Sequence, residues 1–483
     1  MQSVGSVRYV LDTENHCRRT AVDLIYRGQI ICRLLKVYKR IMSLPLLHRK
    51  LAICWCLAAA SPAILSPTVL LAQENLTPQG AEYAIVGALA GDQVRPQSAV
   101  SQTGGYLVWQ DNAITTLGLR IRAVHLGSSL AADGLPFVIS SAASSKTAGE
   151  QEKPQVSLLS SDGAVFVWQG GKKGAQQIFA RFVNPDGSFI SKADIRVSTH
   201  TKNNQTDPTV ATLADGSVIV VWSSFGQDGS MQGVFAQRFS ATGGRIGGEF
   251  QVNQFTFNNQ RSPAVAAVAS GGFVVAWVSE LQRAAASVEI YARIFDSAGN
   301  GSAEFPVSVT TSNACANPAV AGSPQGGFGV AWSQNDNVLL AFGDGFGGVP
   351  VSGVATSKST NSWDIFGCVF DVNGTATNLP VRLNTRTYGD QYAPKISALA
   401  DAYLAVWTSL GQDGSWEGVF GQALADDESF IGSELRVNTT TVSRQIQPAV
   451  SADGSTRLLV TWSSFVPSGD FDLFAQQYQL TGP

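Results

Sequence analysis

A tryptophan at the end of a short apolar run recurs seven times along the chain, and this repeat restricts the fold more than any other feature. The seven are Trp109, Trp168, Trp222, Trp277, Trp332, Trp407 and Trp462. A proline stands 13 or 14 residues before each of them, and six of these prolines have a glutamine three residues earlier. Cys315 replaces that glutamine in the fifth copy. A unit of about 55 residues repeated in this way predicts an array of similar structural units.

Each copy divides into four short segments with the composition of β-strands. In the third copy these are residues 208–213 (PTVATL), 217–222 (SVIVVW), 234–239 (VFAQRF) and 249–253 (EFQVN). Asp215-Gly216, between the first two, is typical of a hairpin turn. Four strands per unit and a period of this length predict the blades of a β-propeller, slightly longer than WD40 or kelch units.

The two ends of the chain are predicted to complete one blade together. After Trp462 the last copy continues through a third strand and has no fourth. Residues 82–86 (EYAIV) begin fourteen residues before Pro96, the same offset as Glu249 before Pro263. We therefore expect an all-β fold: a seven-bladed β-propeller of four-stranded antiparallel blades, a single domain over residues 73–483, closed by an N-terminal outer strand.

Composition agrees with a β-rich chain and excludes several other classes. The 483 residues include 48 glycines and only three methionines, and 14% are charged, which argues against a helical bundle or coiled coil. Ten of the 33 basic residues but only three of the 36 acidic ones lie within residues 1–73. The predicted propeller is therefore acidic and lacks the excess of basic residues that nucleic-acid binding requires.

The N-terminal residues have the pattern of a targeting segment. Residues 51–72 are uncharged and mostly apolar, and His48-Arg49-Lys50 precedes them. We predict a signal peptide over 42–72 with cleavage after Ala72; an uncleaved membrane anchor is the alternative. Because Met42 would be an ordinary start, residues 1–41 are interpreted as a mis-called or disordered extension. The protein is expected to be secreted, periplasmic or on the cell surface, with membrane contact only if the segment stays uncleaved.

Cysteine usage gives the predicted propeller no disulfide framework. Four of the six cysteines precede residue 57, which leaves Cys315 and Cys368, both in the fifth copy. They fall on a first and a third strand, which are not neighbours, although export would permit a bond between them. Their pairing stays open at this point, and the fold must depend on a large apolar core.

The repeat resembles one found in large secreted or surface-exposed bacterial proteins, often beside cadherin-like or calcium-binding domains. The resemblance rests on Gln-x-x-Pro-x-Val-Ala, Asp-Gly, Val-Val-x-Trp-Ser-Ser, Gly226-Gln-Asp-Gly-Ser230, Val-Phe-Ala-Gln-Arg-Phe and Glu-Phe-x-Val-Asn. It covers nearly all of the part predicted to be exported. It implies a secreted bacterial binding or surface protein and assigns no catalytic residue.

The repeated residues themselves are interpreted as structural. Seven equivalent tryptophans would pack between neighbouring blades, and the repeated glutamines would hold loop backbone by hydrogen bonds. Function is then expected where the copies differ. The largest difference is an insertion at about residues 338–358, between the second and third strands of the fifth copy.

The insertion shares one face of the predicted propeller with the connections from each fourth strand to the next first strand. Candidate ligand-binding residues on this face are Asp336, Asp344, Phe346, Trp363, Asp413 and Trp416. The two tryptophans lie outside the repeated positions; an exposed ring can stack on a sugar, and a loop anchor is the alternative. Asp228 and Asp413, in Gln-Asp-Gly-Ser motifs, are interpreted first as turn residues, with calcium ligation as the alternative. No other cofactor is expected.

The sequence favours a binding module over an enzyme. Only His125 and His200 follow the predicted leader, and neither has a cysteine or carboxylate beside it at metal-ligand spacing. No nucleophile elbow, phosphate loop or dinucleotide motif is present. We expect a monomer that binds a carbohydrate or a surface protein, and not nucleic acid. A secreted carbohydrate-active hydrolase or lyase that uses carboxylates across the same face, and a structural scaffold, are the alternatives.

Overall fold

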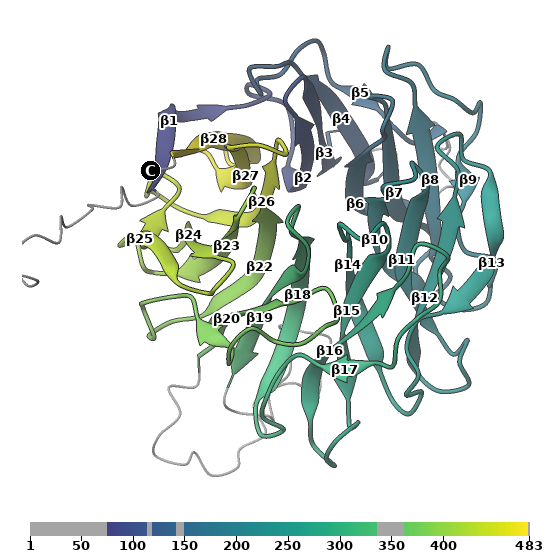
Figure 1. The fold of residues 1–483 in the computed structure, drawn as a ribbon. Helices are drawn as coiled ribbons and strands as arrows, with labels where there is room; N and C mark the ends of the chain where they lie inside the picture. The colour runs from purple at the N-terminus through teal and green to yellow at the C-terminus, as the bar shows by residue number, and fades with distance from the viewer. Residues whose placement is uncertain (1–74, 114–117, 142–148, 336–361, 482–483) are drawn as a thin grey trace, which may run out of the picture. The chain divides into compact units, whose positions relative to one another are not determined.

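Antiparallel strands carry all seven repeats (Figure 1). A computed structural model describes residues 75–113, 118–141, 149–335 and 362–481, all within one compact unit, Ala72–Pro483. The predicted extension and signal peptide (1–41 and 42–72) and the insertion at 338–358 lie outside the described residues. Within the described ranges, no helix is long and apolar enough to cross a membrane.

Blades one to six take their four strands in chain order. The first strands are β2 (Gln93–Ser101), β6 (Glu150–Leu158), β10 (Gln205–Thr212), β14 (Gln260–Ala267), β18 (Ala314–Gly322), β22 (Gln391–Ala398) and β26 (Gln445–Ala452). The second strands are β3 (Gly104–Asp111), β7 (Ala164–Gly171), β11 (Val218–Phe225), β15 (Phe273–Glu280), β19 (Phe328–Asn335), β23 (Ala402–Leu410) and β27 (Arg457–Phe465).

The outer half of each blade consists of the remaining two strands. The third strands are β4 (Arg120–Leu126), β8 (Gln177–Val183), β12 (Gln232–Phe239), β16 (Val288–Phe295), β20 (Asp364–Phe370), β24 (Glu417–Ala425) and β28 (Phe471–Thr481). The fourth strands are β5 (Phe137–Val138), β9 (Ile195–Arg196), β13 (Arg245–Gln251), β17 (Phe305–Pro306), β21 (Val381–Arg382), β25 (Phe430–Arg436) and, in the seventh blade, β1 (Asn75–Ala84).

The seven first strands lie side by side and form the inner ring of the propeller. Each contacts the first strands of the blades before and after it, and β2 lies between β6 and β26, so the ring is closed. The second strands are buried along almost their whole length. Packing on both faces explains why they appear in the sequence as continuous apolar runs and not as alternating ones.

The N-terminal strand closes the propeller, as predicted. β1 pairs antiparallel with β28 from Asn75 opposite Thr481 to Ala84 opposite Phe474. The backbone N–H of Ile85 extends the pairing by donating to Leu473 O at 3.1 Å. The observed strand begins seven residues before the predicted one at residue 82 and contains a register shift between Gln79 and Tyr83. The outer edge of β28 is therefore covered.

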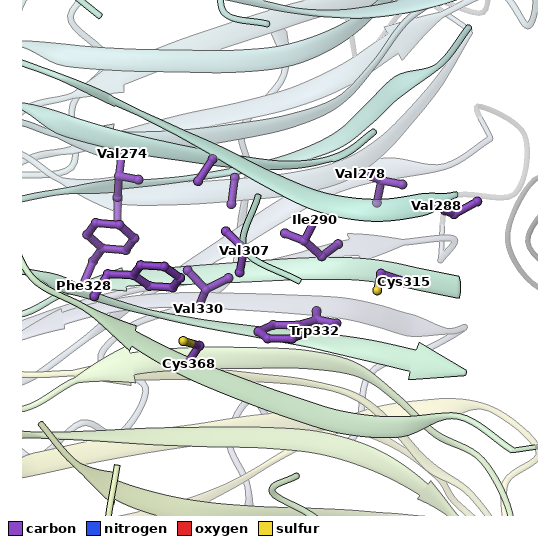
Figure 2. Close-up of a cluster of buried hydrophobic side chains, with 14 of the residues drawn as sticks. Val274, Val278, Val288, Ile290, Val307, Cys315, Phe328, Val330, Trp332 and Cys368 are labelled. Carbon is purple, nitrogen blue, oxygen red and sulfur yellow. The ribbon is translucent and has the colours of Figure 1, made fainter. Parts of the chain in front are cut away.

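The seven repeated tryptophans are all buried, as predicted, and each residue is 0–1% exposed. Trp222 of the third blade packs in one cluster with Val165 and Val167 of the second. Figure 2 shows the equivalent cluster between the fourth and fifth blades, where Trp332 lies with Val274 and Ile290. Each such tryptophan therefore belongs to a contact between blades and not only to its own sheet.

Five of the six repeated glutamines donate to loop backbone, as predicted, and Gln391 donates to Ser409 Oγ instead. Gln205 accepts a hydrogen bond from the Trp222 indole at 3.1 Å and donates to Lys202 O at 3.2 Å. In the fifth blade Cys315 occupies the glutamine position, and the Trp332 indole donates instead to Gln334 Oε1 at 3.2 Å. The exception in the repeat is therefore compensated by a neighbouring amide.

The two described cysteines are free and buried. Cys315 and Cys368 belong to the same apolar cluster, and Figure 2 shows their side chains apart. Burial raises the pKa of the Cys315 thiol to about 12 and raises the pKa of Cys368 as well. Both are therefore thiols at neutral pH and act as small apolar side chains.

A left-handed residue stands immediately before the repeated proline in every blade. The seven "bulge residues" have φ of 51–56°, and they are Arg95, Lys153, Asp207, Ser262, Asn317, Ala393 and Gln447. The pairing between first and second strands shifts register across this point in each blade. None is glycine, so a sevenfold bulge is held in a conformation that non-glycine residues rarely adopt.

The bulge joins each blade to the one before it. In five of the seven blades the bulge N–H donates to the side chain that follows the repeated tryptophan of the preceding blade. Examples are Asp207 N to Gln169 Oε1 at 3.0 Å and Ser262 N to Ser223 Oγ at 3.1 Å. These bonds satisfy buried polar groups between blades and help to offset the backbone strain.

Carboxylates near the fourth strands also connect successive blades. The four "latch carboxylates" accept backbone N–H groups from the connection that leaves the preceding blade, and they are Glu82, Glu249, Glu304 and Glu434. Glu249 binds Thr199 N at 2.7 Å and Gln227 Nε2 at 2.5 Å. Glu82, on the N-terminal strand, binds Thr439 N at 2.6 Å and Thr440 N at 2.9 Å. The N-terminal strand therefore repeats the contacts of an ordinary fourth strand.

We expect Glu249→Gln to lower the free energy of unfolding by about 1 kcal/mol. The glutamine side chain has the same shape, but its NH₂ group would face an N–H group that now donates to the carboxylate. It also lacks the negative charge that strengthens these hydrogen bonds. Urea unfolding measures the change. Glu434→Gln repeats the test in the sixth blade, and unchanged midpoints in both variants would contradict a linking role for these carboxylates.

Candidate functional site

Exposed apolar side chains gather on one face of the propeller, here named the connection face. It comprises the loops between second and third strands and the connections from each fourth strand to the next first strand. Among the described residues, nine of the fifteen exposed large apolar side chains lie there or at adjoining strand ends: Phe225, Met231, Phe257, Val309, Tyr388, Leu410, Trp416, Val442 and Phe465. Of these nine residues, only Trp416 was predicted from the sequence as a candidate. Exposed apolar groups concentrated in this way are typical of a binding surface.

Blade six carries the largest share of these residues. Tyr388, Trp416 and Val442 are 79%, 59% and 75% exposed. They come from three neighbouring segments: the connection 383–390, the loop 411–416 and the connection 437–444. Ser415 bridges two of these segments, since its Oγ accepts from Ser443 N at 3.2 Å. The loop bearing Trp416 is therefore fixed at its base while the indole remains exposed.

Trp416 has a defined counterpart in blade three. The backbone N–H of Gly411 donates to Trp416 O at 2.5 Å, and Gly226 N donates to Met231 O at 2.6 Å in the equivalent loop. The two loops thus share one backbone arrangement and differ in the side chain at this position. The loop in blade six has an aromatic ring at this position, and the loop in blade three has a methionine.

Arg444 lies over the Trp416 ring and links it to other polar side chains. The Arg444 guanidinium lies 5.2 Å from the centroid of the ring. Its Nε is 3.4 Å from Oε2 of Glu417. Burial, together with the charge of Glu417, raises the pKa of Tyr392 to about 12, so its hydroxyl stays protonated. An exposed aromatic ring with a guanidinium, a carboxylate and a phenol nearby can stack on an apolar sugar face and hydrogen-bond its hydroxyls. We name Trp416, Glu417, Arg444 and Tyr392 the Trp416 cluster.

Asp228 and Asp413 lie in equivalent turns, and each aspartate side chain accepts a hydrogen bond from the backbone of its own turn. Oδ1 of each accepts the backbone N–H two residues later at 3.1 Å, from Ser230 and Ser415. Asp413 Oδ2 also accepts from Asn438 Nδ2 at 3.1 Å. These hydrogen bonds are those expected of turn residues, the first of the two interpretations made from the sequence. The described part of the chain contains no group of three or more His, Cys, Asp or Glu side chains that could hold a metal ion.

The remaining predicted site residues have different positions. Trp363 is partly buried against the apolar cluster between blades four and five, an arrangement that favours the loop-anchor alternative. Asp336, Asp344 and Phe346 lie outside the described residues. Among the predicted site residues, Trp416 is therefore the one that is exposed and has polar side chains near it that could bind a sugar.

The two histidines do not form a catalytic group with the Trp416 cluster. His125, on the third strand of blade one, lies 3.5 Å from Asp133 Oδ2, a partner eight residues away that sequence inspection did not assign. Tyr106 packs edge-on to its ring, and these residues line a surface cavity of about 400 Å³. His200 lies on the connection 197–204 of blade two.

The fold defines a class, the β-propellers, and comparison with known proteins agrees at that level. No protein-family model matches the sequence, and no curated protein matches it. The polysaccharide lyase Uly1 is similar in structure, with a TM-score of 0.50 and 8% identity over 81% of this chain and 90% of that one. The propeller domain of the trilobed protease from Pyrococcus furiosus has a TM-score of 0.44 and 9% identity over 82% and 97%. A protein of unknown function from Dyadobacter fermentans gives 0.46 and 12% over 69% and 96%.

Proposed function

We propose that this protein is an exported, non-enzymatic binding module that recognises a carbohydrate through the connection face, with Trp416 as the stacking platform. The observation that carries the proposal is the Trp416 cluster: an exposed indole beside a guanidinium, a carboxylate and a protonated phenol. The other exposed apolar residues of the face extend the surface that a chain of sugars would cover.

The cellular setting of the proposal comes from the sequence. The apolar segment 51–72 and the resemblance of the repeats to those of secreted bacterial proteins support export and a role at or beyond the cell surface. The propeller fold is shared with carbohydrate-active enzymes such as a polysaccharide lyase, and it is equally shared with proteins of other functions. Binding without turnover is preferred because Asp228 and Asp413, the two described aspartates among those proposed on this face, hold their own turns.

Replacing Trp416 by methionine tests the platform. Because blade three accommodates Met231 in the same loop geometry, we expect Trp416→Met to leave the melting temperature unchanged. We expect it to lower the affinity for the best glycan from a polysaccharide screen by about tenfold, since a sugar ring loses its aromatic partner. Isothermal titration with the full chain measures the affinity.

Phe430→Met is the matched control, because Phe430 is also exposed in blade six but at the start of β25, away from the connection face. Its glycan affinity should equal that of the wild type. Equal loss in both variants, or full affinity in Trp416→Met, would overturn the assignment of Trp416. New reducing ends or unsaturated products in the same samples would instead establish an enzyme.

A further inference from the structure

The surface cavity beside His125 lies between blades one and two. Blade one contributes Tyr106 from β3, His125 from β4 and part of the loop 127–136, and blade two contributes the turn 184–188 that follows β8. This turn joins a third strand to a fourth, so the cavity lies at the end of the blades away from the connection face. Its volume of about 400 Å³ is that of a site for a small organic molecule.

Blade one alone has a hydrogen-bonding side chain at the Tyr106 position of the repeat. Tyr106 stands three residues before the repeated Trp109, and it pairs with His125 of the neighbouring strand. The residues at the same position in the other six blades are Val165, Ile219, Val274, Gly329, Leu404 and Leu459. Tyr106 is therefore a departure from the repeat, and such departures are where function is expected.

The hydroxyl of Tyr106 has no hydrogen-bond partner among the described residues, although Tyr106 is only 2% exposed. The ring is held edge-on by His125 at 5.2 Å and by Phe166 at 5.5 Å between centroids. Burial raises the pKa of Tyr106, so the hydroxyl stays protonated. Buried polar groups are rarely left unpaired. An unpaired hydroxyl in a residue that lines a cavity indicates that a ligand supplies the missing hydrogen bond.

Two carboxylates line the same cavity. Oδ1 of Asp186 accepts the backbone N–H of Ser188 at 2.9 Å and its hydroxyl at 2.6 Å. These bonds lower the pKa of Asp186, so it is ionised at neutral pH, and its Oδ2 has no hydrogen-bond partner among the described residues. Asp133 Oδ2 lies 3.5 Å from Nδ1 of His125. None of the described residues that line the cavity is a lysine or arginine, so the cavity favours a cation.

The chemistry of the wall suits an organic ammonium group better than a metal ion. The two carboxylates and the Tyr106 oxygen can accept the three N–H groups of a primary ammonium. The rings of Tyr106 and Phe137 and the exposed side chain of Leu135 provide apolar surface for a hydrocarbon chain, and aromatic faces attract cations. Among the described residues, these acidic groups do not form a cluster that could hold a metal ion.

We propose that this cavity binds a primary ammonium group carried on a hydrocarbon chain, with Asp133, Asp186 and Tyr106 as its hydrogen-bond acceptors. A free polyamine and a lysine side chain both present this chemistry. The site is separate from the proposed glycan site, because it uses other residues at the other end of the blades. Either proposal can therefore fail without the other.

Hexylammonium and hexanol are the first probes, since they share their hydrocarbon chain and differ in the charged group. Calorimetric titration of the full chain, at neutral pH and low ionic strength, would compare the wild type with Asp133→Asn, Asp186→Asn and Tyr106→Phe. Asp427→Asn is the matched control. Asp427 is exposed in a turn between third and fourth strands of blade six, and it accepts the backbone N–H of Ser429 at 2.9 Å, as Asp186 does from Ser188.

The wild type and Asp427→Asn should bind hexylammonium at least tenfold more tightly than hexanol. Either of the other aspartate variants should lose most of this preference. Tyr106→Phe keeps the ring and should lower the affinity for hexylammonium about fivefold, because one hydrogen bond is lost. Spermidine and Nα-acetyl-lysine methylamide, titrated in the same way, identify the source of the amine by which of them binds more tightly.

Each other result contradicts the proposal in a recognisable way. Equal binding of hexylammonium and hexanol, or binding of neither, would overturn the ammonium site. A preference that survives in both Asp133→Asn and Asp186→Asn would place the cation elsewhere on the acidic propeller. An equal loss in Asp427→Asn would mean that the overall charge, and not the cavity, attracts it. Unchanged affinity in Tyr106→Phe would remove the hydroxyl from the site.

Discussion

Trp222→Ala should lower the free energy of unfolding by about 3–5 kcal/mol, the range for removing a fully buried large aromatic side chain. Trp222 is 0% exposed, packs against the second blade, and donates its indole N–H to Gln205. The substitution therefore leaves a cavity between two blades and an amide oxygen without its partner. Urea unfolding monitored by circular dichroism measures the loss.

Trp416→Met is the internal comparison, because it also removes an indole but from an exposed position. A similar loss of stability in both variants would show that exposure does not separate structural from functional tryptophans in this fold. A loss in Trp222→Ala of less than 1 kcal/mol would contradict the assignment of the repeated tryptophans to the core.

Removing residues 75–86 should destabilise the protein more than Trp222→Ala does and should also make it self-associate. The deletion eliminates β1, the buried side chain of Ile85 and the latch carboxylate Glu82. It also exposes the edge of β28 over its paired length, and an exposed edge strand recruits other chains. We expect a loss of roughly 5 kcal/mol or more, from the buried apolar area and the strand pairing lost, together with self-association.

Size-exclusion chromatography and thermal unfolding test this expectation. Deletion of residues 2–13 is a control of the same length within the predicted extension, and it should leave both properties unchanged. A monomeric 75–86 deletion with the wild-type melting temperature would mean that β1 contributes nothing to closure.

The repeat predicted the fold because its period and its apolar runs are local features of the sequence. The four strands per blade, the buried tryptophans, the glutamine hydrogen bonds and the closing N-terminal strand all follow from them. Closure could be foreseen since residues 82–86 hold the same offset from the next proline as ordinary fourth strands.

The bulge residues were missed because their positive φ depends on a register shift between two strands and on a donor–acceptor pair with another blade. Their sequence signal was nevertheless available. A polar residue follows most of the repeated tryptophans, such as Gln169 and Ser223, in strands that are otherwise apolar. A polar residue at a buried position predicts a specific partner, and that partner is the bulge.

The candidate site was predictable only in part. Trp363 and Trp416 look alike in the sequence, as both lie outside the repeat just before third strands, yet one packs on the core and the other is exposed. This difference depends on which neighbouring segments cover each ring.

The closing strand has a consequence for the order of events during synthesis. β1 is made first but its partner β28 ends at Thr481, so β1 must wait for almost the entire chain before it can pair. Blades one to six contain only consecutive strands and can form as they emerge. A ribosome stalled within the last blade would therefore hold a nearly finished propeller that still carries one unpaired strand, the species most open to chaperones, proteases and aggregation.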